Sequence, residues 1–91
     1  MSKKSILKKN GGAFAEFDGG EAVLFNTDDR RSYLLNRCAS EVYKLTDGKR
    51  NIGKVTEIIK KNYRVDANII EKDIKEIYKG FLKREIVFHV E

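Results

Sequence analysis

The sequence contains no proline and no tryptophan, and among its 91 residues it has one cysteine, one histidine and no long hydrophobic run. Without a second cysteine the chain cannot form an internal disulfide, and Cys38 alone cannot supply a cysteine-based zinc site. Cys38 and His89 together offer a transition metal few soft ligands. We therefore expect no disulfide, no metal site and no cofactor.

The apolar runs are much shorter than the roughly 20 residues that a membrane helix needs. The N-terminus has no apolar core of signal-peptide length, so we expect a cytoplasmic protein with no membrane partner. A chain of 91 residues fits one domain with one modest core. The sequence shows no phosphate-binding glycine loop and no nucleophile–base set. We therefore predict no catalytic residues and no enzymatic activity.

The net charge of +5 is concentrated at the N-terminus. Lys3, Lys4, Lys8 and Lys9 fall within the first 12 residues, which contain no acid and end in two glycines. Such a segment attracts an acidic partner or nucleic acid, or is simply solvated. We predict a flexible basic tail over residues 1–12 and a folded domain over residues 13–91.

Three short strands are predicted in the first half of the domain, over residues 13–17, 21–25 and 31–35. Asp18-Gly19-Gly20 is a strong turn signal, because glycine accepts positive φ without steric cost. A second turn is predicted over residues 26–29. Two such short connections indicate an antiparallel meander. Apolar residues fall on both faces of this sheet, so each face needs cover or a partner.

Three helices are predicted in the second half. Asn36, Asn51 and Asp66 are good N-cap residues for helices that begin just after them. Gly48 is a stop signal for the first helix, and the second should end near Tyr63. Apolar residues recur at helical spacing and predict the inner faces: Cys38, Val42 and Leu45; Ile52, Val55, Ile58 and Ile59; Ile70, Ile74, Ile77 and Phe81, with Tyr78 and Leu82 beside them.

Residues 86–90 have a strand-like composition and form either a wing beside the helices or an irregular segment. The predicted fold class is therefore α+β: a three-stranded antiparallel β-meander followed by a three-helix winged helix-turn-helix.

An ordered set of short patterns carries a family resemblance. A strand ends in Leu35-Asn36 and opens a helix with Ala39 near its start. The helix ends at Asp47-Gly48, an Asn51-capped helix follows, and a long helix over residues 66–82 precedes Ile86-Val87. In this order the chain resembles the PqqD-like family of RiPP recognition elements over about residues 13–90. The lack of tryptophan leaves the subfamily open.

The resemblance implies a peptide chaperone. It would bind the leader region of a ribosomally synthesised precursor peptide and present it in trans to a modifying enzyme, such as a radical SAM enzyme, or to a lasso leader protease. The leader would add as a strand along residues 31–35 and lie against the third helix. The implied peptide-binding residues are Arg31, Ser32, Tyr33, Leu34, Leu35, Ile69, Asp73, Glu76, Ile77 and Gly80.

General physics supports the same location. The last strand of a meander is an edge strand with unpaired N–H and C=O groups, which an extended peptide can satisfy. The same edge invites dimer formation, so we expect a monomer or an edge-strand dimer. Tyr33 fits a core position as well as a peptide contact, and Gly80 fits close helix packing as well as close approach of a peptide.

The alternative function is a winged-helix DNA-binding regulator. Affinity for DNA depends strongly on basic side chains that contact phosphates. Residues 66–82 contain four acids and three bases, so the third helix would bind phosphate poorly. We expect no nucleic-acid partner. Cys38 is interpreted as a small core residue, since no activating base lies near it in sequence.

Overall fold

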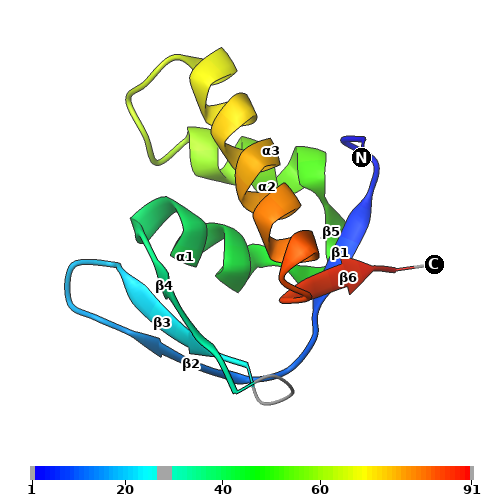
Figure 1. Ribbon diagram of the computed structural model, residues 1–91. Helices are drawn as coiled ribbons and strands as arrows, with labels where there is room; N and C mark the ends of the chain where they lie inside the picture. Colours follow the sequence, from blue (N-terminus) through cyan, green and yellow to red (C-terminus); the bar gives the residue numbers. More distant parts are fainter. Residues whose placement is uncertain (1, 27–29, 91) are drawn as a thin grey trace.

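The computed structural model describes residues 2–26 and 30–90, which form three helices and six strands (Figure 1). The predicted α+β class is confirmed. The helices are α1 (Arg37–Leu45), α2 (Ile52–Lys60) and α3 (Ala67–Lys83). The strands are β1 (Ile6–Lys9), β2 (Ala13–Glu16), β3 (Ala22–Phe25), β4 (Ser32–Leu35), β5 (Asp47–Asn51) and β6 (Val87–His89).

Each helix begins where its cap residue predicts. The Asn36 side chain accepts from the Ala39 N–H at 2.8 Å, and the Asn51 side chain accepts from the Lys54 N–H at 2.8 Å. Asp66 caps α3 in the same way. These bonds satisfy N–H groups that have no partner within the first turn of a helix. The second helix ends at Lys60, slightly before the predicted end.

The first predicted sheet is present, with antiparallel pairing in the order β2-β3-β4. One face is buried against the helices and carries Ala22, Leu24 and Leu35. The opposite face leaves apolar side chains in solvent: Leu34 is 72% exposed and Phe25 is 43% exposed. The turn predicted at residues 26–29 lies, apart from Asn26, outside the described residues.

A second sheet, with the order β5-β1-β6, was not predicted. The expected meander and winged helix-turn-helix therefore describe the chain incompletely. Figure 1 shows the two sheets on opposite sides of the helices, and both chain ends lie on the side of the second sheet. The strand-like C-terminal segment belongs to this sheet as β6, which pairs with β1.

The prediction of a flexible tail over residues 1–12 was wrong for residues 6–9, which form a strand. Residues Ile6–Lys9 form β1, the central strand of the second sheet, and Leu7 is only 2% exposed. A central strand satisfies its backbone groups on both sides and cannot be removed without exposing them. The lysines of this segment stay at the surface, where the Lys8 ammonium lies 4.8 Å from the centroid of the Phe88 ring.

The N-terminal segment also supports the start of α2. The Ser5 carbonyl accepts from the Ile52 N–H at 2.9 Å, and the Lys3 carbonyl accepts from the Gly53 N–H at 2.9 Å. A Cβ at Gly53 would lie 3.3 Å from that Lys3 carbonyl, so glycine permits the close approach. The first N–H groups of α2 are thus satisfied by a distant part of the chain.

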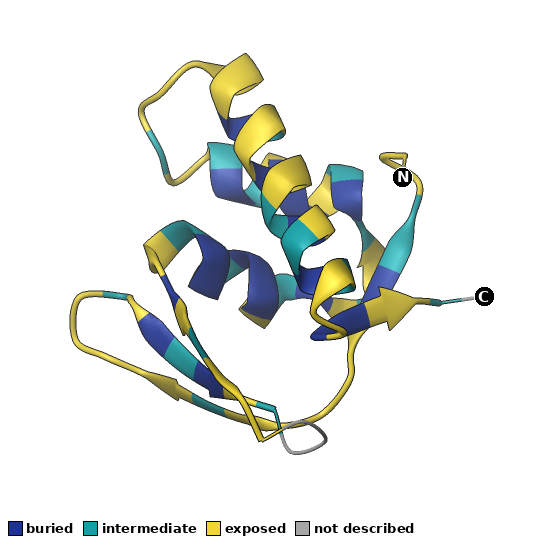
Figure 2. Ribbon diagram, in the orientation of Figure 1, coloured by how far each residue is buried: buried dark blue, intermediate teal, exposed yellow. Residues whose placement is uncertain are grey.

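The core lies between the helices and the inner faces of the sheets (Figure 2). From α3 it takes Ile70, Ile74, Tyr78 and Phe81. Ile77, predicted for the same stripe, is only partly buried. None of the described helices is long and apolar enough to cross a membrane.

Replacing Leu7 with alanine should lower the free energy of unfolding by about 2–5 kcal/mol, the usual range for truncating a buried leucine. Lys4→Ala, at an exposed position in the same segment, is the matched control and should change it by less than about 0.5 kcal/mol. Urea denaturation measures both values. Equal, small effects would mean that the N-terminal segment contributes little to the fold.

Candidate functional site

A groove of about 370 Å³ lies between β4 and the C-terminal half of α3. Its apolar part includes the buried residues Leu35, Phe81 and Ile86. The residues that line the groove are Ser32, Tyr33, Leu34, Leu35, Ala39, Glu76, Ile77, Gly80, Phe81, Arg84 and Ile86. A concave apolar surface with a few polar groups at its margin is the usual form of a binding site.

The free edge of β4 forms one wall of this groove. No other described strand pairs with β4 on the side away from β3. The Asn26 N–H donates to the Arg31 carbonyl at 2.8 Å, which identifies that pair as hydrogen-bonded. Because hydrogen-bonded and non-hydrogen-bonded pairs alternate along an antiparallel ladder, the backbone groups of Ser32 and Leu34 point to the free edge.

Seven of the ten predicted peptide-binding residues line this one groove. They are Ser32, Tyr33, Leu34, Leu35, Glu76, Ile77 and Gly80. Arg31 lines an adjoining hollow. Ile69, which is 56% exposed, and Asp73 line neither. The role of all ten in peptide binding stays a prediction.

Gly80 faces the groove. A Cβ placed there would lie 2.7 Å from Arg84 Nη1, the flexible end of a side chain. Arg84 folds back over the last turn of α3, where this nitrogen donates to the Gly80 carbonyl at 3.2 Å. Close packing of Gly80 against a neighbouring helix, one of the two explanations from the sequence, therefore does not apply.

Sequence reasoning missed four lining residues: Ala39 and Phe81, which it placed elsewhere, together with Arg84 and Ile86. Arg84 follows Glu76 and Gly80 at intervals of four residues, which places all three on one helical face. That spacing could have revealed it, but the predicted helix ended at residue 82. Ile86 enters the groove through the turn after α3, and no local pattern signals this.

Cys38 lies beside the core and is only partly buried. Burial raises the pKa of its thiol, and the nearby carboxylates Glu41 and Asp73 raise it further. A raised pKa keeps the thiol protonated and so weakens it as a nucleophile. In residues 2–26 and 30–90 there is no cluster of three His, Cys, Asp or Glu side chains that could hold a metal ion.

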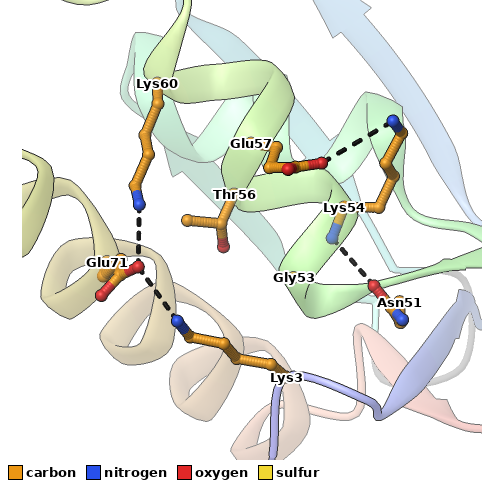
Figure 3. Close-up of a pocket in the computed structure, with 8 residues that line it drawn as sticks. All are labelled: Lys3, Asn51, Gly53, Lys54, Thr56, Glu57, Lys60 and Glu71. Carbon is orange, nitrogen blue, oxygen red and sulfur yellow. Dashed lines mark hydrogen bonds and ion pairs between the residues drawn. The ribbon is translucent and has the colours of Figure 1, made fainter.

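A second pocket, of about 510 Å³, lies where the N-terminal segment meets α2 and α3 (Figure 3). Glu71 of α3 receives hydrogen bonds from Lys60 at 2.8 Å and from Lys3 at 3.1 Å. These bonds and the two positive charges lower the pKa of Glu71 to about 2. The pocket is therefore crossed by ion pairs that connect three segments, and we interpret it as structural.

Comparison with known proteins identifies the family. The family model described as Coenzyme PQQ synthesis protein D (PqqD) matches residues 21–87. The chain belongs to the PqqD family. The resemblance inferred from the sequence is thereby confirmed. A comparison with curated protein sequences gave no match.

Two solved structures share the fold of this PqqD-family chain. TbiB1 in complex with the TbiA(beta) leader peptide has a TM-score of 0.77 at 20% identity, over 88% of this chain and 93% of that one. The solution structure of the PqqD truncation of Methylobacterium extorquens PqqCD, described as a functional and stand-alone RiPP recognition element, has a TM-score of 0.76 at 24% identity. This match covers 96% of this chain and 93% of the PqqD chain. At these identities the likeness shows the fold.

The ion pairs of Glu71 predict an acid-sensitive contribution to stability. The folded pKa of about 2 lies below the ordinary value of 4.5. The contribution is therefore fully present above about pH 4.5 and is lost as the pH falls towards 2. Glu71→Gln should lower the melting temperature at pH 6 and should flatten its fall between pH 5 and pH 2.5.

Glu57→Gln is the matched control, because Glu57 lines the same pocket and makes only an exposed ion pair with Lys54 at 3.7 Å. It should leave the acid-side slope of the melting temperature as in the wild type. If Glu71→Gln also leaves that slope unchanged, the three-segment ion pair does not contribute to stability.

Proposed function

We propose that the protein binds the leader region of a ribosomally synthesised precursor peptide by β-strand addition to β4. In this mode α3 forms the opposite wall of the site. The observation that carries the proposal is that the free edge of β4, with the outward backbone groups of Ser32 and Leu34, opens onto an apolar groove. Backbone bonds to such an edge give affinity, and pockets for alternate side chains give specificity.

Three further observations support this function. The chain belongs to the PqqD family. One protein of the same fold was solved in complex with a leader peptide, and another is described as a RiPP recognition element. The groove also joins one polar backbone edge to apolar side chains of Leu35, Ile77 and Phe81, as an extended amphipathic peptide requires.

In this proposal residues 13–91 act together with the N-terminal segment as a non-catalytic module that presents the leader in trans. The partner that receives it is a modifying enzyme such as a radical SAM enzyme, or a lasso leader protease. The proposed state is a monomer or an edge-strand dimer, and a bound leader would occupy the edge that such a dimer uses.

Leu34→Pro tests the binding mode. Proline removes the N–H that points to the free edge and fixes φ, and an edge strand tolerates this better than a central strand. We expect the affinity for the cognate leader to fall about tenfold or more, since a hydrogen bond is lost and the backbone is misaligned. Calorimetry measures the affinity, and a thermal melt should show a folded protein.

Leu34→Ala is the matched control, because it shortens the side chain on the outer face and keeps the N–H. It should lose much less affinity for the leader than Leu34→Pro does. Amide chemical shifts on titration with the leader report the surface directly. Shifts confined to α2 and β6, with β4 unmoved, would contradict this binding mode, and salt-sensitive binding to duplex DNA without leader binding would favour the DNA-binding alternative.

A further inference from the structure

The groove continues into a hollow that is rich in basic side chains. The hollow is lined by Arg31, Tyr33, Lys83, Arg84 and Glu85, and it shares Tyr33 and Arg84 with the groove. Among these described lining residues, three bases and one acid leave an excess of two positive charges. The bases come from both walls, Arg31 from the strand side and Lys83 with Arg84 from the end of α3.

Arg84 is the best placed of these bases to meet a peptide. Its guanidinium group lies 6.0 Å from the centroid of the Tyr33 ring, so it reaches from the end of α3 towards β4. It uses one of its donors on the Gly80 carbonyl at 3.2 Å. A guanidinium group has five N–H donors in a planar fork that matches a carboxylate, so donors remain for a ligand.

The position of these bases along β4 sets a register for the ligand. Side chains alternate between the two faces of a strand, and Leu35 and Tyr33 lie on the face turned towards the helices. Arg31 lies two residues before Tyr33, and its side chain therefore falls on the same face. The Asn26–Arg31 hydrogen bond shows that the pairing with β3 extends to it. An added strand would therefore place residues i, i+2 and i+4 beside Leu35, Tyr33 and Arg31.

The two ends of this register differ in chemistry. Leu35, Ala39, Ile77 and Phe81 line the groove and not the hollow, and they suit an apolar side chain. The basic end beside Arg31 lies four residues from Leu35, which is about 13 Å along an extended strand. The C-terminus of α3 has a partial negative charge that would by itself repel a carboxylate, so attraction there depends on the basic side chains.

From this arrangement we infer that the ligand carries an aspartate or glutamate that binds between Arg31 and Arg84. This carboxylate lies four residues along the strand from an apolar residue that fills the groove beside Leu35. The inference rests on the proposed function, because it assumes that the peptide adds to β4. It assigns Arg84 as a specificity-determining residue for an acidic position in the leader.

The test begins with a phage-displayed library of random 12-residue peptides selected on the full chain. We expect the enriched peptides to carry Asp or Glu four residues from a large apolar residue. The best peptide is then synthesised with an amidated C-terminus, so that a terminal carboxylate cannot replace the side chain, in an acid form and a Glu→Gln or Asp→Asn form.

The acid form should bind about fivefold more tightly than the amide form, the upper range for a partly exposed ion pair. Added salt should reduce this difference. In Arg84→Gln the affinities of the two forms should differ by less than about twofold, because only Arg31 then remains to bind the carboxylate, so the two changes are not additive. Arg84→Lys should restore part of the difference, because it keeps the charge but loses the planar fork.

Lys75→Gln is the matched control, since it removes the same charge from an exposed position of α3 that does not line the groove or the hollow. It should preserve the difference between acid and amide forms. Peptides that shift the β4 amides but show no acid preference would overturn this inference and leave the proposed function intact. Peptides that bind elsewhere, or no binding peptide at all, would overturn both.

Discussion

The packing of the inner face of α3 is the interaction on which the rest of the structure depends. Ile74 and Tyr78 are almost completely buried between the other elements. The Tyr78 hydroxyl lies 2.8 Å from the Thr46 hydroxyl, which itself donates to the Val42 carbonyl at 2.7 Å. A buried hydroxyl needs such partners, so these bonds fix the rotation of α3 against α1. Phe81 adds edge-on ring contacts to Tyr43 and Tyr78.

That rotation decides which side chains of α3 reach the groove. With Tyr78 in the core, its neighbour Ile77 is turned towards β4, and Gly80 and Arg84 follow on the same side. The groove is therefore a consequence of core packing, which holds the α3 wall in place. A wall held in place next to a free strand edge reduces the ordering that a peptide must cause when it binds.

Local signals in the sequence predicted the helices and the first sheet. The second sheet, which the sequence did not predict, forms by pairing between segments that are far apart in the chain. Asn36, Asn51 and Asp66 act within a few residues of themselves, and a cap can be identified from those residues alone. By contrast, β1 and β5 are rich in charged residues and are stabilised by pairing with each other, as in Ile6↔Asn51. The pattern of residues within one strand does not reveal which distant segment pairs with it.

The same distinction applies to the candidate site. The edge strand could be predicted because its position follows from two short turns, and Gly80 because it interrupts a helical pattern. Arg84 was missed although it continues the spacing of Glu76 and Gly80, because its role depends on where the helix ends and on its contact with Tyr33. A side chain that spans from one element to another gains its function from their spacing. Here the buried side chains of α3 fix that spacing. A basic residue at the margin of the groove thereby becomes part of the site.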